Sequence, residues 1–533
     1  MSFGIPVRNG LGLGLLASTT LATQNAFGTP TPTPTLNLDF TTMTALPSTI
    51  TFSRPSNATY YDSTGKLTYA PNNLLLNSAT LSTQNVTTAP INYILSFQGT
   101  GSIVRTGTST GTLTGTGVSN RVFVAFTPTA GTLTLTVAGS VTSAQLEAVT
   151  YQTTPGTYNA TTSAAYYGAR LDYNPATLAA RGLLIEEART NRAFPSNNFL
   201  GWTTDNVTVT ANQTTSPDGT VSAALLNSGT GTSQHQIFVF STGFTVGLPF
   251  TGSVYAKAGT GRYLTICLIG DTARGGYANF DLIGGNVTQS GALSGGGTFN
   301  SASITAVGNG FYRLTVTATS TADSQAYISY ATSNTATYVP DAGGRKVYTG
   351  TGETYYIWGP QFEQGSFPTS YIPTAGGPVS RSADTASMTG TNFSSWYNAT
   401  AGAFLVQFDT PASGTRIISA ADDNTANNNI QMLTSGTDPT FLVTTSGTAQ
   451  ASIDAGTVAA NTVYKFAGTY SANDFAACIS GGTVGADTSG TIPTVDRLRI
   501  GAGQAGNTLC GHVALLNYYP QRLPNATLQS LTS

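Results

Sequence analysis

The sequence predicts an all-β protein, built from several β-sandwich domains in tandem behind an extended N-terminal anchor. Charged residues make up only 8% of the chain, against roughly 25% in an ordinary soluble domain. β-Branched and aromatic residues alternate with Thr, Ser and Gly over short runs, a pattern that favours half-buried strands and tight turns. At about 150 residues per domain, the 533 residues suffice for three or four units, each able to bury a core without disulfides.

The first 35 residues predict an anchor followed by a spacer. Residues 1–28 are apolar but repeatedly interrupted by glycine, so we expect them to order only against another molecule. Residues 29–35 alternate Thr and Pro, which favours a short polyproline II spacer; an irregular edge segment packed on the first domain is the alternative. The leucines after Arg8 are faintly similar to a secretion signal, although glycines interrupt the apolar stretch.

The following part of the chain predicts short strands. Residues 36–71 hold short apolar and aromatic runs with an Asp-Ser-Thr-Gly turn at residues 62–65. Further on, residues 93–97, 121–126 and 132–137 each alternate with period two, as the strands of a small sandwich do.

Residues 191–375 predict a larger sandwich. Its last strand contains Pro360, which cannot donate a ladder hydrogen bond, so we expect an edge position or a bulge there. The other strands are expected at residues 207–209, 223–226, 236–240, 252–257, 263–268, 278–282, 303–307, 311–318 and 326–331.

The last domain is predicted after Gly376-Gly377-Pro378, a linker by composition. Strands are expected at residues 404–408, 415–419, 462–470 and 497–501. Pro524 suits the first turn of a terminal helix.

Several of these segments resemble known families. Residues 359–374, Gly-Pro-Gln-Phe-Glu-Gln-Gly-Ser-Phe-Pro-Thr-Ser-Tyr-Ile-Pro-Thr, resemble the closing signature of a carbohydrate-binding-module-like jelly roll found in tailed-phage structural proteins. Residues 251–259 and 307–316 resemble the same family, and residues 510–529 resemble the terminal strand and helix of laminin-G/concanavalin-like jelly rolls.

The resemblance also covers the hairpin of residues 36–71 and the segments 169–175 and 181–191, which in that family usually follow such a hairpin closely. Here a long interval separates them, so we interpret it as an inserted module. The predicted regions are 1–35, anchor and spacer; 36–71 plus 159–190, a β-hairpin connecting region; 72–158, a small inserted β-sandwich; 191–375, the carbohydrate-binding-module-like jelly roll; and 376–533, the laminin-G/concanavalin-like jelly roll.

The resemblance implies a structural component of a tailed-phage virion, without enzymatic activity. It would be a fibre, spike or decoration protein located in the virion. Residues 1–35 would bind other virion proteins of the capsid or tail, and the outer domains would contact host surface glycan. Such fibres are commonly homo-oligomers, with a trimer favoured. The alternatives are a secreted bacterial adhesin, which needs a working signal peptide, and a glycan-degrading tailspike, which needs paired acids in a groove.

Four aromatic residues of the larger sandwich are candidates for carbohydrate binding, because aromatic rings stack on the C–H faces of sugars. They are Trp202, Tyr263, Tyr277 and Trp358. The same rings also fill sandwich cores, which is the competing interpretation. We expect Trp358, in the closing strand, to be the most structural of the four, and Tyr277, in a Gly-rich loop, to be the most exposed.

No catalytic or metal-binding residue is predicted, although three patterns match by letters. Residues 107–111 match G-x-S-x-G without the strand-turn-helix context, and only His235 and His512 could serve as its base. Residues 501–506 match G-x-G-x-x-G but precede a strand instead of a helix. Glu186 and Glu187 are adjacent, so on a strand they face opposite ways and cannot form a glycosidase pair together.

Cofactors are not expected, with calcium as the alternative. Asp422, Asp423 and Asn424, with the asparagines at 427–429, offer oxygen ligands, but no Glu follows at EF-hand spacing and a polar turn is favoured. The three Cys residues lie far apart among apolar neighbours, which predicts buried free thiols. The net charge of −2 without a Lys/Arg-rich run argues against nucleic acid, and no apolar run is long enough to cross a membrane.

Overall fold

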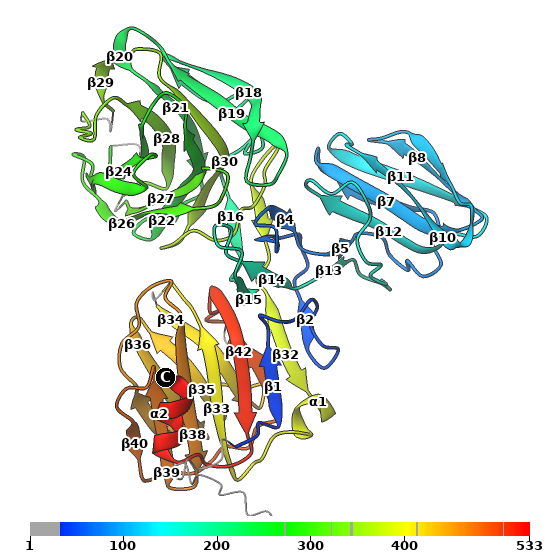
Figure 1. Cartoon of the computed structure of the whole chain (residues 1–533), viewed down its shortest axis with the longest axis vertical. Helices are drawn as coiled ribbons and strands as arrows, with labels where there is room; N and C mark the ends of the chain where they lie inside the picture. Colours follow the sequence, from blue (N-terminus) through cyan, green and yellow to red (C-terminus); the bar gives the residue numbers. More distant parts are fainter. Residues whose placement is uncertain (1–31, 271–272, 321, 342–344, 412–413, 505) are drawn as a thin grey trace, which may run out of the picture. The chain divides into compact units, whose positions relative to one another are not determined.

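The computed structural model describes residues 32–533, apart from residues 271–272, 321, 342–344, 412–413 and 505. The described chain is almost entirely β-structure, with two short helices, α1 (Thr391–Ser394) and α2 (Asn525–Thr532) (Figure 1). The prediction of an all-β fold is confirmed. Of the anchor and spacer predicted at residues 1–35, residues 1–31 lie outside the described residues. Residues 34–533 form one compact unit. Neither described helix has the length and hydrophobicity that crossing a membrane requires.

Two six-stranded antiparallel sheets form the sandwich within residues 191–375. Their inner faces share one core that includes Trp202, Phe280 and Phe362. Each strand predicted in this region overlaps an observed one. The first sheet has the strand order β17 (Thr203–Asp205), β21 (Gln236–Thr242), β28 (Gln325–Ser333), β23 (Tyr263–Gly270), β24 (Gly275–Asp281) and β25 (Asn286–Ala292). The second sheet has the order β18 (Val207–Thr215), β19 (Val221–Ser228), β30 (Thr354–Gln364), β22 (Pro249–Ala258), β27 (Tyr312–Thr319) and β26 (Thr298–Ala306). A separate pair consists of β20 (Thr232–Gln234) and β29 (Val347–Thr349).

Strand β30 is the structural centre of this sandwich, because it pairs with β19 on one side and β22 on the other. Its register against β22 shifts at Val254, so that Gly359 and Pro360 together oppose one residue. Gly359 has a φ of 59°. The predicted bulge is therefore confirmed, whereas the strand is central and not at an edge: the bulge places the missing N–H of Pro360 outside the ladder.

A smaller sandwich with its own core occupies residues 84–149. It contains the three strands predicted by period-two alternation. A three-stranded sheet has the order β10 (Gly117–Phe126), β7 (Asn92–Gly99) and β12 (Thr142–Val149), and a four-stranded sheet has the order β6 (Gln84–Thr88), β11 (Gly131–Ala138), β8 (Ser102–Gly107) and β9 (Gly111–Thr114). The strand before this sandwich in sequence, β5 (Asn72–Asn73), pairs with the strand after it, β13 (Tyr166–Tyr167).

The last sandwich recruits strands from the beginning of the described chain. One sheet consists of β14 (Arg170–Tyr173), β15 (Ala180–Ile185), β42 (Gly511–Tyr519), β33 (Ala401–Phe408), β38 (Tyr464–Ser471), β39 (Asp474–Ile479) and β40 (Gly485–Asp487), with β1 (Leu36–Asp39) also on β42. The other consists of β2 (Thr51–Ser53), β32 (Thr385–Thr389), β41 (Arg497–Ile500), β34 (Thr415–Asp422), β35 (Asn429–Ser435), β36 (Asp438–Thr445) and β37 (Thr448–Asp454). Two short pairs remain, β3 (Thr59–Tyr61) with β4 (Leu67–Tyr69) and β16 (Arg189–Asn191) with β31 (Val379–Arg381).

This arrangement differs from a separate connecting region at residues 36–71 and 159–190. Strand β1, blue in Figure 1, lies beside red β42, where Leu36 pairs with Tyr518, and β15 pairs with β42 as well. Thr35, at the end of the predicted spacer, donates its N–H to Tyr518 O at 2.9 Å. The first and last strands of the described chain therefore complete one sheet.

Candidate functional site

Five buried charged side chains meet around strands β14, β15 and β31. Arg170, at the start of β14, forms ion pairs with Glu186 and Asp384. Arg54 donates to the same Asp384 at 2.9 Å, and Arg381 pairs with Glu186. All five side chains are buried. We call Arg54, Arg170, Arg381, Glu186 and Asp384 the arginine–carboxylate cluster.

The arginines of the cluster keep Glu186 ionised. Burial alone would raise the pKa of Glu186, but the charges of Arg381 and Arg170 outweigh it and hold that pKa well below its ordinary value. Burial lowers the pKa of Arg54 to about 10 in spite of Asp384, so Arg54 still carries its charge at neutral pH. A carboxylate of this kind cannot act as a general acid near neutral pH.

Ser370 and Asn191 tie this cluster to the closing segment of the larger sandwich. Ser370 donates its N–H and its hydroxyl to the Glu186 carboxylate, both at 2.7 Å. Asn191 donates to the carbonyls of Pro360 and Ile372, at 3.1 and 2.8 Å, and accepts from Phe362 N. The segments that carry the phage resemblance therefore bond mainly to one another.

A second set of charges surrounds His512 on β42. Its Nδ1 lies 3.0 Å from Asp409 Oδ1 and its Nε2 lies 2.9 Å from Asp172 Oδ2. Arg181 contacts Asp409 from the other side at 3.0 Å. Burial by itself lowers the pKa of His512, but the Asp409 charge and the two hydrogen bonds raise it above its ordinary value. We call this set the His512 cluster.

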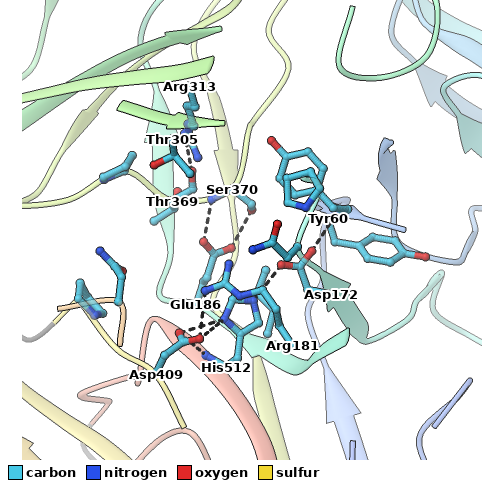
Figure 2. A pocket seen from close by; sticks show the side chains of 18 of the residues that line it. Tyr60, Asp172, Arg181, Glu186, Thr305, Arg313, Thr369, Ser370, Asp409 and His512 are labelled. Atoms are coloured by element: carbon cyan, nitrogen blue, oxygen red, sulfur yellow. Dashed lines mark hydrogen bonds and ion pairs between the residues drawn. The ribbon is translucent and has the colours of Figure 1, made fainter. Parts of the chain in front are cut away.

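The His512 cluster and Glu186 of the arginine–carboxylate cluster line one pocket with a cavity volume of about 610 Å³. Figure 2 shows Asp409 and His512 in the lower part of the view, Asp172 near its middle and Arg313 with Thr305 in the upper part. The remaining wall includes Tyr60, Asn174, Ser303 and Phe367. A pocket of this size with few convergent polar groups has the character of a small-molecule site.

The acidic groups of this pocket are committed to cations, so they offer neither a free general acid nor a metal site. Asp409 has its pKa held well below the ordinary value, because His512 and Arg181 outweigh the effect of burial. Cys510 also lines the pocket, but burial and the nearby Glu187 raise its pKa to about 12, so it stays a thiol. In the described part of the chain no cluster of His, Cys, Asp and Glu could hold a metal ion.

The four aromatic residues proposed for sugar binding are not brought together. Trp202 is 6% exposed and stacks on Tyr330, with ring centroids 5.7 Å apart. Trp358 is 5% exposed and donates to Ser222 at 3.0 Å. Trp202, Tyr277 and Trp358 belong to three different core clusters. Their binding of sugar stays a prediction.

The expectation that Tyr277 is the most exposed of the four is wrong. Tyr277 is 7% exposed and packs against Tyr338, with ring centroids 5.8 Å apart. The glycines before it open strand β24, which lies inside the sheet between β23 and β25. Tyr263, beside the Arg262 guanidinium, is half-buried and is the most accessible of the set.

The remaining letter matches have structural roles. Residues 107–111 form the turn between β8 and β9, and His235 is buried with its ring nitrogens on the carbonyls of Asn206, Gly231 and Tyr348. Residues 501–504 and 506 lie in the connection between β41 and β42. In the calcium candidate, Asp422 pairs with Arg499 at 2.7 Å, and calcium binding there stays a prediction.

The pocket residues were not predicted as a site. One signal could have found them: in a chain of 8% charge, residues 170–189 hold Arg170, Asp172, Arg181, Glu186, Glu187 and Arg189. Charges concentrated in this way on short strands must meet partners when they are buried. The partners Asp384, Asp409 and His512 lie far away in sequence and carry no local pattern.

Comparisons with known proteins give no family. No protein-family model matches the chain, and no curated protein matches it. Among solved structures, domains LG4–5 of the mouse laminin α1 chain are 10% identical, with a TM-score of 0.19, over 64% of this chain and 91% of that one. Trypanosoma rangeli sialidase is 11% identical, with a TM-score of 0.21, over 58% of this chain and 60% of that one. Likenesses this distant carry no argument about this chain.

Proposed function

We propose that this chain is a non-enzymatic structural component of a tailed-phage virion: a fibre, spike or decoration protein that contacts host surface glycan. Residues 1–35 would attach it to capsid or tail proteins, and it would assemble as a homo-oligomer, with a trimer favoured. The observation that carries the proposal is that the segments that resemble phage proteins form ion pairs and hydrogen bonds with one another. Glu186, which follows β15 of the last sandwich, pairs with Arg170 on the neighbouring strand β14 and accepts from Ser370 N in the closing segment of the larger sandwich. Asn191 donates to Pro360 O of β30.

Such bonds suit a structural scaffold. A buried cluster of paired charges fixes one arrangement of the segments that meet there, because any partner left alone would be a buried unpaired charge. Glu186 and Asp409 have pKa values held well below the ordinary range, so neither can act as a general acid near neutral pH, which supports the non-enzymatic part of the proposal.

The test is the composition of purified particles from the phage that encodes this chain. Mass spectrometry should detect the full-length chain in gradient-purified virions, and a variant lacking residues 1–35 should fold but be missing from them. Light scattering of the free protein should give three copies. Recovery of the chain from the cell envelope or the medium, with none in virions, would instead support the secreted adhesin.

One observation favours the tailspike alternative as a second candidate. Asp62 and Glu147 line another pocket, with a cavity volume of about 940 Å³. Burial raises the pKa of Glu147, although hydrogen bonds from Gln145 and Gly156 oppose it, and a raised carboxyl pKa is what a general acid needs. Release of fragments from host polysaccharide by the wild type, lost in Glu147→Gln, would establish this activity; no release from either would leave the non-enzymatic proposal in place.

A further inference from the structure

Arg313 is a cation that faces the 610 Å³ pocket without a paired carboxylate. It lies on β27, and its Nη2 donates to Thr369 O at 2.7 Å and to Ser253 Oγ at 3.2 Å. Its guanidinium carbon lies 5.5 Å from the centre of the Tyr255 ring. Among the described residues, no Asp or Glu oxygen lies within 4.0 Å of its nitrogens.

The carboxylates nearest to this wall are already occupied. Glu186 pairs with Arg170 and Arg381, and Asp409 and Asp172 share His512, with Arg181 on Asp409. Behind the wall, Glu363 accepts hydrogen bonds from Thr369 N and Thr369 Oγ1 and from Gln361. Thr369 therefore separates Arg313 from Glu363, and the pocket side of the guanidinium stays available.

The surroundings of Arg313 fit a sugar better than an apolar ligand. Ser303 and Thr305 present hydroxyls from β26, and both residues are exposed. Tyr60 adds a half-buried ring to the same pocket, and Asn174 adds an amide. Hydroxyls and amides bind sugar hydroxyls, and a ring packs on the C–H face of a pyranose.

We propose that this pocket binds a sugar residue that carries an acidic group, carboxylate or phosphate, and that Arg313 receives that group. A planar guanidinium whose remaining N–H groups can donate hydrogen bonds fits the geometry of either anion. The inference rests on the proposed contact with host surface glycan and names its chemical class: an acidic polysaccharide. The pocket joins residues of the larger sandwich with β14, β15 and β42, so it exists only in the assembled chain.

The test uses surface polysaccharide extracted from the host, titrated calorimetrically against the full chain. One portion stays native, one has its carboxyl groups reduced to alcohols, and one has its phosphates removed. We expect the native polysaccharide to bind, and one of the two treatments to weaken binding by about tenfold or more, as loss of a charge-assisted contact does. The treatment that does so identifies the acidic group.

Three variants locate the site. Arg313→Gln should weaken binding of the native polysaccharide by about tenfold without changing binding of the treated one. Thr305→Trp fills the pocket from an exposed strand position and should abolish binding without disturbing the core. Thr298→Trp is the matched control, since Thr298 is exposed on the same strand but does not line the pocket, and it should bind like the wild type.

The outcomes separate this inference from the proposed function. Equal binding of native and treated polysaccharide by the wild type, or undiminished binding by folded Arg313→Gln and Thr305→Trp, overturns the pocket and leaves host glycan contact standing. No binding of any portion by the wild type overturns the glycan contact and the pocket together, whereas presence of the chain in virions is measured independently.

Discussion

At the scale of single residues, Arg170 carries the most consequential contacts, because its guanidinium pairs with two carboxylates far apart in sequence, Glu186 just after β15 and Asp384 just before β32. Arg170→Met removes one cationic partner from each of the buried carboxylates Glu186 and Asp384. We expect the free energy of unfolding to fall by about 3–5 kcal/mol. Urea denaturation followed by circular dichroism measures it.

The matched control is Arg262→Met, which breaks the Arg262–Asp281 pair at 2.6 Å. The Arg262 side chain is 49% exposed, so water replaces the lost partner and stability should change far less. Equal losses in the two variants would show that the arginine–carboxylate cluster does not hold the fold together.

His512 gives the chain a pH dependence with a definite sign. Its pKa is raised in the folded state, chiefly because Asp409 outweighs burial, so its charged form stabilises the fold. That contribution is complete below the ordinary pKa of about 6.5 and is lost as pH rises through the folded value. The free energy of unfolding should therefore decline on the alkaline side.

The variant His512→Gln should lose this alkaline decline while keeping the acid-side loss that follows from the lowered pKa of Glu186, because Arg381 and Arg170 lower that pKa independently of His512. Thermal unfolding of both proteins from pH 5 to pH 9 compares the slopes. An unchanged alkaline slope in His512→Gln would assign the effect to another group.

At the scale of elements, period and turn chemistry predict the strands well but not their partners. The alternation within residues 263–268 and 326–331 is enough to place β23 and β28, since side chains alternate between faces in any strand. The local sequence around Leu36 does not predict that this residue pairs with Tyr518. The same limit hid the candidate site, because His512 and Asp172 meet only after β14, β15 and β42 share a sheet.

Tyr277 shows that a local turn signal can also mispredict an element. Two glycines before an aromatic residue suggest a loop, yet Gly275 and Gly276 form the start of β24. A Cβ on Gly275 would lie 2.1 Å from Leu268 O, so glycine is needed there for close strand packing and not for a turn.

The bulge in β30 gives a prediction at this scale. Gly359 has a φ of 59°, and a Cβ there would lie 3.0 Å from the Tyr255 ring and 3.4 Å from Tyr371. Gly359→Ala should lower the free energy of unfolding by about 1–2 kcal/mol for the left-handed backbone and by about 1–3 kcal/mol more for overpacking.

Gly247→Ala isolates the backbone contribution, because Gly247 has a φ of 79° and a Cβ there meets nothing within 4 Å. Chemical denaturation should rank the wild type above Gly247→Ala and Gly247→Ala above Gly359→Ala. If the two variants were equally stable, the Tyr255 and Tyr371 rings would move aside without lowering the free energy of unfolding, and the overpacking contribution would be absent.

At the scale of the whole molecule, the small sandwich has the contacts of an independent insertion. Its core draws on residues 75–148, with only Tyr69 and Leu74 packed against it from outside. The cores of the larger and the last sandwich contain no residue from 74 to 165. Asn73 and Tyr166 are paired neighbours in β5 and β13, so the chain enters and leaves the insertion at one point.

We therefore expect a chain in which Asn-Gly replaces residues 74–165 to fold, since a two-residue turn suits antiparallel neighbours. It should keep the alkaline decline in stability that reports the His512 cluster, although it loses contacts such as Gln152 to Thr68 at 2.7 Å. Circular dichroism and pH-dependent thermal unfolding measure both properties. An unfolded product, or one without the alkaline decline, would mean that the small sandwich is required to assemble the strands around His512, and that the chain folds as one unit instead of as a scaffold with an insertion.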